Sequence, residues 1–196
     1  MENNIAKPLF ISFSAEVNQN TAENLMGIFA QRLNQGTKDF YLLLSSPGGS
    51  VMNGITVYNF LKSLPINLTT HNIGIVDSIA NVIFLAGKTR YAVKNSSFLF
   101  HGVGFDINQA RFEEKNVKEK LKMIQRDQKL IADIIAEQSQ YTQEEIEKMF
   151  LEADTCTPEQ AKEKGLINEI REANIPEGAE VVQFIFQKKE AACQLR

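Results

Sequence analysis

Ser78 and His101 are the two side chains in this 196-residue sequence whose types and settings point to acyl-transfer chemistry. Ser78 follows a strand predicted at 67–76 and opens a short apolar helix, so its hydroxyl is exposed and the next amide, that of Ile79, has no partner within the helix. His101 ends an apolar strand and precedes Gly102-Val103-Gly104. Strand ends of this kind commonly carry catalytic side chains in α/β proteins. A nucleophile, a base and free backbone donors are the parts that acyl transfer needs.

A second source of backbone donors is the turn Pro47-Gly48-Gly49, which joins a leucine-rich strand at 40–44 to a helix that begins after Ser50. Glycine lacks Cβ, so the backbone can come close to a ligand there. Free amides at a helix start bind phosphate in nucleotide-binding proteins and oxyanions in hydrolases. The turn by itself predicts an anion site, and both phosphate binding and the stabilisation of a hydrolytic oxyanion remain open.

Each of these features also has a purely structural explanation. A serine at a helix start is commonly an N-cap, and a histidine at a strand end is commonly part of the packing. His71 lies in the polar middle of a predicted strand and is expected on the sheet surface. Cys156 and Cys193 have no metal-type spacing, so we expect neither a disulfide framework nor a metal site, and no cofactor is indicated.

Strands and helices alternate along the chain and must position these residues. Strands are predicted at 8–14, 40–44, 67–76, 90–93, 98–100 and 166–170, with an edge strand at 181–186. Helices are predicted from Asn20 to Gly36, from Val51 to the residue before Pro65, at 77–86 and at 109–138. Two more are predicted to begin at Thr142 and at Pro158, and the second of these ends at Gly165. Asn20 with Glu23 and Thr142 with Glu145 are the expected capping pairs. This alternation predicts an α/β fold with a parallel sheet and helices on its faces, in one domain spanning residues 1–196.

Composition excludes several classes of protein. The formal net charge of −3 comes from 21 basic and 24 acidic residues that are scattered along the chain, which argues against nucleic-acid binding. No segment reaches the roughly 18 apolar residues that span a bilayer, and the first seven residues lack the pattern of a signal peptide. We therefore expect a cytoplasmic protein that does not bind membranes.

The segment 109–138 has a charged composition with an apolar stripe. Its apolar residues recur at alternating steps of four and three, with a break at Gln128, and comprise Val117, Leu121, Ile124, Ile131 and Ile135. A helix of this length spans about 45 Å, which is longer than a compact domain of this size can cover. Part of the helix is therefore expected to project and pack on another subunit, and the alternative is a helix lying along its own domain.

Three motifs, taken in order, carry a family resemblance. They are Ser45-Ser46-Pro47-Gly48-Gly49-Ser50-Val51, Gly74-Ile75-Val76-Asp77-Ser78-Ile79-Ala80-Asn81 and Lys94-Asn95-Ser96-Ser97-Phe98-Leu99-Phe100-His101. Their order and spacing resemble the proteolytic subunit of the Clp protease family. The likeness runs from about Phe10 to Ile170 and includes Ala15-Glu16-Val17-Asn18 and Ala161-Lys162-Glu163-Lys164-Gly165-Leu166-Ile167.

The resemblance implies a serine endopeptidase on a ClpP/crotonase-like spiral of β-α-β units. Ser78 is then the nucleophile, His101 the general base, and the amides of Gly49 and Ile79 the oxyanion hole. The head comprises 1–108 and 139–196. The 109–138 segment corresponds to a projecting handle helix that interdigitates between heptameric rings of identical subunits. Such rings enclose a chamber that admits peptides or unfolded proteins.

The chain departs from the family pattern at several positions. Asp77 precedes the serine where the family has alanine, and Ala80-Asn81 follow Ile79 where the family has small residues. A gapless alignment of the catalytic aspartate falls on Ala153, so a one-residue slip makes Asp154 the expected third member of the triad, with Glu152 as second choice. The start of the chain is short relative to the family, so docking of an unfoldase ATPase is possible but not favoured.

Two other functions remain open at this point. An acyl-CoA enzyme of the crotonase superfamily would also use paired backbone amides, although it would not need a serine and histidine pair. A weak or inactive paralogue could instead act as a ring subunit. If neither carboxylate reaches His101, the site is a slower dyad or is inactive.

Overall fold

The computed structural model describes residues 7–104, 111 and 113–183, and the account below concerns these residues. Predictions for Cys193, for residues 184–186 of the edge strand and for residues 109, 110 and 112 of the long helix lie outside this part of the chain.

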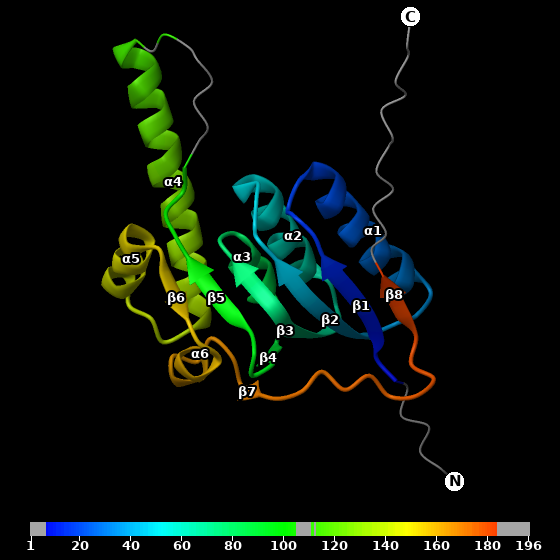
Figure 1. Ribbon diagram of the computed structural model, residues 1–196. Coiled ribbons are helices and arrows are strands. Elements are labelled where there is room, and N and C mark those ends of the chain that lie inside the picture. Colours follow the sequence, from blue (N-terminus) through cyan, green and yellow to red (C-terminus); the bar gives the residue numbers. More distant parts are fainter. Residues whose placement is uncertain (1–6, 105–110, 112, 184–196) are drawn as a thin grey trace, which may run out of the picture.

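A sheet of eight strands forms the centre of the molecule (Figure 1). Its main path has the order β6-β5-β3-β2-β1-β8, and β4 pairs with both β3 and β7. All strand pairs are parallel except β5 with β6. The strands are β1 (Leu9–Ser14), β2 (Asp39–Ser46), β3 (Asn67–Asp77), β4 (Thr89–Ala92), β5 (Ser97–Phe100), β6 (Asp154–Cys156), β7 (Glu169–Ile170) and β8 (Val181–Gln183).

The long strand β3 has two neighbours on one side. Its first half pairs with β4, from Thr69 opposite Thr89, and its end pairs with β5, from Ile75 opposite Ser97. The chain therefore steps outwards along one edge of β3, which places the end of β5 beside the end of β3.

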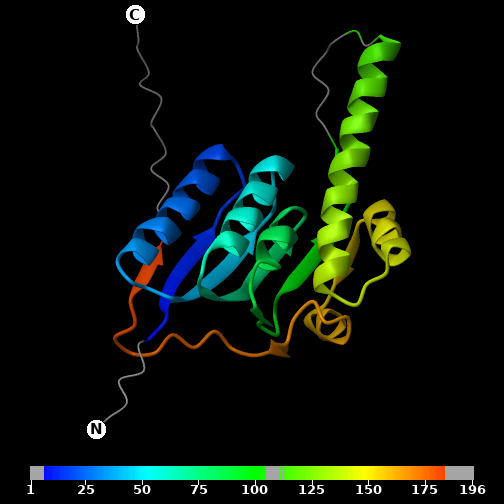
Figure 2. The same cartoon turned by 180° about the vertical axis from the view of Figure 1, so that it is seen from behind.

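The helices are α1 (Gln19–Asn34), α2 (Val51–Ser63), α3 (Ala80–Phe84), α4 (Glu114–Gln138), α5 (Gln143–Glu152) and α6 (Pro158–Glu163). Figures 1 and 2 together show that α1, α2 and α3 lie on one face of the sheet. The core between these layers is apolar, with Phe29 of α1 and Phe84 of α3 buried in one cluster with Leu42 and Leu44 of β2. The predicted α/β architecture with a parallel central sheet is confirmed, although these three helices share one face.

Several predicted boundaries were wrong. The first helix begins at Gln19 because Asn18, not Asn20, caps it: the Asn18 side chain accepts from the Thr21 amide, and the Thr21 hydroxyl accepts from the Asn18 amide. The helix predicted at 77–86 is only Ala80–Phe84, since β3 continues to Asp77 and Ser78 has a positive φ of 55° that no helix accepts. The closing strand 166–170 is reduced to Glu169–Ile170, and β6 was not predicted. A strand of three residues offers too little alternation to be recognised.

The long helix α4 is divided between two environments. It begins at Glu114, later than predicted, with Glu113 as its N-cap, and it stands out from the rest of the molecule in Figure 1. Ile131 and Ile135 near its end are 6% and 0% exposed, whereas Val117 and Leu121 near its start are 54% and 51% exposed. The apolar residues near the end of α4 thus pack on the rest of the chain, whereas those near its start remain exposed among the described residues.

Length alone does not make α4 a membrane segment, because it is rich in charged residues. In the part of the chain that the structure describes, no helix is both long enough and apolar enough to cross a bilayer.

Arg90 of β4 ties together segments that lie far apart in the sequence. Its Nε donates to the Leu166 carbonyl at 2.7 Å, and one terminal nitrogen donates to the carbonyls of Gln138 at 2.9 Å and Gly165 at 3.0 Å. The side chain thus satisfies carbonyls at the ends of both α4 and α6. A planar guanidinium can serve several such acceptors in a fixed geometry, which an ammonium group cannot.

Replacement of Arg90 by lysine should therefore destabilise the fold. We expect Arg90→Lys to lower the free energy of unfolding by about 2–4 kcal/mol, because hydrogen bonds to charged groups contribute about 1.5–3 kcal/mol each and a lysine keeps only part of them. Urea denaturation measures this loss. The matched control is Arg32→Lys, which alters a surface ion pair with Glu180 and should change stability by under about 1 kcal/mol. Equal losses in the two variants would contradict the role of Arg90.

Candidate active site

The Pro-Gly-Gly turn lies directly against the turn that carries Ser78. The register of β2 and β3 pairs Ser46 with Val76, so the residues that follow each strand emerge side by side. A Cβ built on Gly48 would lie 2.7 Å from both the Asp77 carbonyl oxygen and the Ser78 Cβ. With φ values of 86° and 140°, Gly48 and Gly49 also occupy backbone conformations that L side chains rarely adopt.

The segment after β1 fixes this turn from its other side. The Val17 amide donates to the Gly48 carbonyl at 2.7 Å, and the Ser50 amide donates to the Val17 carbonyl at 2.7 Å. A Cβ on Gly49 would lie 2.3 Å from that same carbonyl oxygen. Gly48 is therefore held against the Ser78 turn and Gly49 against Val17, and only glycine fits at either position.

Ser78 itself sits in a strained turn that β5 holds in place. Its φ of 55° is in the left-handed region, which costs a non-glycine residue about 1 kcal/mol or more. Its amide donates to the Leu99 carbonyl at 2.8 Å. The buried Asn81 side chain bridges the carbonyls of Ser78 and Leu99 at 3.0 and 2.9 Å. Strain of this kind at a serine between a strand and a helix is typical of a functional turn.

Two backbone donors are free beside Ser78. The Gly48 amide donates to the Ser46 hydroxyl at 3.2 Å, whereas the amides of Gly49 and Ile79 have no hydrogen bond to any residue that the structure describes. Ile79 is fully buried, and its side chain packs so closely on α2 that a Cβ on Gly54 would lie 2.3 Å from it. Free donors from two neighbouring turns form the kind of pair that stabilises an oxyanion.

His101 lies just past the end of β5 and is exposed. Its Nδ1 is 2.8 Å from the Gly102 carbonyl oxygen. Because a carbonyl only accepts, Nδ1 carries the proton in the neutral ring, which leaves the lone pair on Nε2. This is the tautomer that a general base for a serine hydroxyl needs.

Asp154 has no hydrogen bond or ion pair to His101 within the described residues. In the antiparallel β5–β6 pair, Asp154 lies opposite Phe100 and Cys156 lies opposite Phe98. Residues directly opposite each other share a face of the sheet, so Asp154 sits on the face of the two phenylalanines, while His101 follows Phe100 and falls on the other.

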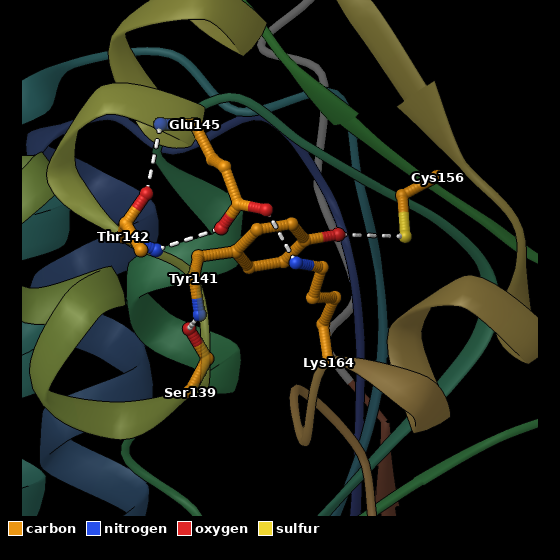
Figure 3. Close-up of polar contacts among 6 residues, drawn as sticks. All are labelled: Ser139, Tyr141, Thr142, Glu145, Cys156 and Lys164. Atoms are coloured by element: carbon orange, nitrogen blue, oxygen red, sulfur yellow. Dashed lines mark hydrogen bonds and ion pairs between the residues drawn. The ribbon is translucent and has the colours of Figure 1, made fainter.

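The surroundings of Asp154 form a separate polar cluster. It lines an open cavity of about 310 Å³ together with Tyr141 and Lys164. Figure 3 shows Tyr141 at the centre of this cluster, with its hydroxyl 3.5 Å from the Cys156 sulfur and with Lys164 paired to Glu145. Burial and then the Cys156 contact raise the pKa of Tyr141, and the charge of Asp154 contributes. Burial likewise raises the pKa of the Cys156 thiol, so this cysteine is not an activated nucleophile.

Two further predicted residues have other partners. Glu152, the second choice for the triad, ends α5 and lies 3.9 Å from Lys148. His71 is fully buried, which corrects its placement on the sheet surface: its Nδ1 is 2.7 Å from the Tyr41 hydroxyl and its Nε2 is 3.0 Å from the Arg171 carbonyl. Burial lowers the pKa of His71, so it is a neutral part of the packing.

Comparisons with known proteins agree on one family. The sequence profile described as Clp protease matches residues 2–174. An ATP-dependent Clp protease proteolytic subunit from Ligilactobacillus salivarius (strain UCC118) is 30% identical over 172 residues, which cover 85% of this chain and 84% of that protein. The chain therefore belongs to the Clp protease family.

The fold agrees with a solved member of that family. A structure of a ClpP1 point mutant from Listeria monocytogenes superimposes with a TM-score of 0.73 at 23% identity, over 83% of this chain and 91% of that one. The expected ClpP-like arrangement of β-α-β units with a long helix is thus confirmed as a fold.

The tight contact at Gly48 leads to a stability prediction. We expect Gly48→Ala to lower the free energy of unfolding by about 1–3 kcal/mol, because the new Cβ meets backbone and is added at a positive φ. The matched control is Gly27→Ala in α1, where a Cβ meets nothing within 4 Å and the substitution should stabilise by about 0.5–1 kcal/mol. Chemical denaturation measures both. A neutral Gly48→Ala would show that the two turns do not depend on each other.

Proposed function

We propose that this chain is a serine endopeptidase in which Ser78 attacks the peptide carbonyl and His101 takes its proton. The observation that carries the proposal is that two turns in direct contact, one with Gly49 and one with Ile79, each leave an amide without a described partner next to a serine with a positive φ. The tetrahedral oxyanion would lie between these amides, where fixed donors stabilise charge that develops in the transition state. His101 would then return its proton to the leaving amine.

The family resemblance predicts Asp154 as the third member of the triad. Its carboxylate would reach His101 only if the loop around Ala153 rearranged. Ala153 has a positive φ of 52°, so the chain already turns sharply there. Membership of the Clp protease family supports peptide or unfolded protein as the substrate.

The rival function is that of an inactive or weak ring subunit. It is favoured by one observation: among the described residues, neither Ser78 nor Asp154 has a hydrogen bond to His101. Catalytic hydrogen bonds are often long or poorly aligned until substrate binds, so a labelling experiment has to separate the two functions.

Covalent labelling tests the nucleophile. We expect a fluorophosphonate probe to label the wild-type protein at Ser78, since such probes react with serines that a base and an oxyanion hole activate. Ser78→Ala should abolish both labelling and cleavage of short unstructured peptides, while Ser63→Ala on α2 serves as the matched control and should change neither. Labelling that survives Ser78→Ala would rule out the assignment, and an unlabelled wild type would favour the inactive subunit.

The acyl-CoA alternative makes a different prediction. A crotonase-type enzyme would be stabilised by binding its thioester ligand, whereas a peptidase would not. We expect no change in Tm with a panel of acyl-CoA compounds; a strong rise would favour the alternative.

Assembly into rings of identical subunits, heptameric by the resemblance, is the second part of the proposal. The start of α4 supports it, because Val117 and Leu121 are four residues apart on one helical face and more than half exposed. Apolar side chains repeated on a projecting helix are typical of a helix that packs on another copy of the chain.

Light scattering after size-exclusion chromatography tests the assembly. We expect the wild type to elute as a multimer and Leu121→Asp to elute as a smaller species, because a carboxylate is placed in an apolar contact. Lys122→Asp puts the same residue at the next, exposed position and should leave the mass unchanged. A monomeric wild type would refute the assembly.

A further inference from the structure

Asp77 is the carboxylate nearest to Ser78 along the sequence, and it has no role in the mechanism proposed above. It ends β3, directly before the strained turn. Its Oδ1 is buried and has no hydrogen-bond partner among the described residues. A buried carboxylate oxygen without a donor is destabilising, so its presence calls for a compensating role.

The sheet register places Asp77 next to His101. Asp77 lies opposite Leu99 in the parallel β3–β5 pair, and His101 follows Leu99 by two residues. Side chains two apart in an extended chain lie on the same face, so Asp77 and His101 share the face opposite to Asp154. Burial raises the pKa of Asp77, and a hydrogen bond from the Leu99 backbone and the attraction to His101 partly offset that rise. The shared face and the sign of this attraction make Asp77 a candidate partner for His101.

The other carboxylates near the end of β5 are engaged elsewhere. On α4, Asp127 is paired with Arg126 at 2.7 Å. On α5, Glu152 faces Lys148 at 3.9 Å. On β6, Asp154 acts on Tyr141 and Cys156. Among these carboxylates, Asp77 is the one that has no described ion-pair or hydrogen-bond partner at its buried Oδ1 and whose burial-raised pKa is partly lowered by the charge of His101.

We propose that Asp77 is the carboxylate that stabilises His101 when it becomes protonated, in place of Asp154. The inference rests on the proposed peptidase function and adds a positioning residue to it. The Ser78 hydroxyl proton moves to Nε2 of His101 as the Ser78 oxygen bonds to the carbonyl carbon. The same proton then passes to the leaving amine as the peptide bond breaks. Asp77 stays ionised throughout and neither gains nor loses a proton.

The two tasks of a triad carboxylate are divided in this arrangement. The Gly102 carbonyl holds the proton on Nδ1 and so fixes the tautomer. Asp77 supplies the negative charge that the imidazolium needs. This division explains why an aspartate can stand before the serine in a chain whose Asp154 faces another cluster.

The pKa of Asp77 gives the proposal an unusual signature. Because the pKa is raised in the folded state, folded protein binds this proton more tightly than unfolded protein. The ionised carboxylate therefore destabilises the fold at neutral pH, and this effect disappears as the pH falls below the unfolded pKa. Replacing Asp77 with a neutral residue should therefore raise the stability of the fold and lower the catalytic rate.

The experiment compares Asp77→Asn, Asp154→Asn and the surface control Glu23→Gln in the full chain. At about pH 7.5 we expect Asp77→Asn to have a higher Tm than wild type, and the difference to vanish at about pH 3. The same variant should lose about 10²–10⁴-fold in kcat and in the rate of fluorophosphonate labelling, with KM unchanged, because only the transition state is affected. Asp154→Asn should lose less, and Glu23→Gln should match wild type.

Three outcomes would overturn the inference. Wild-type kcat in Asp77→Asn would show that the charge is not used, and a parallel loss of Tm and rate would make Asp77 a structural residue. A larger loss in Asp154→Asn than in Asp77→Asn would return the role to Asp154. An unlabelled wild type, in contrast, would refute the peptidase function itself, so the two failures are distinguishable.

Discussion

The contact between two backbone turns determines most of what this molecule can do. One turn follows β2 and contains Gly48 and Gly49, and the other follows β3 and contains Ser78. They meet because β2 and β3 are paired in parallel with Ser46 opposite Val76, so both strands end at the same height. The space between them excludes even a methyl group. The contact fixes the turns whose amides, those of Gly49 and Ile79, are the proposed oxyanion donors, and fixed donors of this kind need no reorganisation during a reaction.

The strand β5 supports this contact from the other side. Leu99 accepts from the Ser78 amide and from the Asn81 side chain, so the strained φ of Ser78 is held by several bonds at once. The same strand leads to His101 two residues later. A single strand thus positions both the Ser78 turn and His101, the proposed nucleophile and base, and any shift of β5 along β3 would displace the two together.

The acidic residues illustrate how alignment and geometry can disagree. The family resemblance gives the acid role to the loop that contains Asp154, because that loop precedes the closing Gly-Leu-Ile segment. The pairing of β6 with β5 turns the Asp154 side chain towards Tyr141 and Cys156 instead. The register of β3 with β5 instead sets Asp77 on the same face of the sheet as His101, which no spacing in the sequence reveals.

Periodic apolar residues and capping motifs predicted much of the fold because they act locally. The capping box of Thr142 with Glu145 and the proline start at Pro158 are as predicted. The start of α1 was misplaced because Asn18 and Asn20 are equally good caps, and the choice depends on how Thr21 also bonds the Glu16 carbonyl. The short strand β6 exists only through its partner β5, so its own three residues could not predict it.

Residue types and their order were enough to identify the family and to name Ser78, His101, Gly49 and Ile79 as candidate site residues. Which of these groups meet depends on the fold, because strand register belongs to a pair of strands and a shift of one residue reverses every side chain. The register brought the glycine and serine turns into contact, buried His71, and set Asp77 and Asp154 on opposite faces of the sheet.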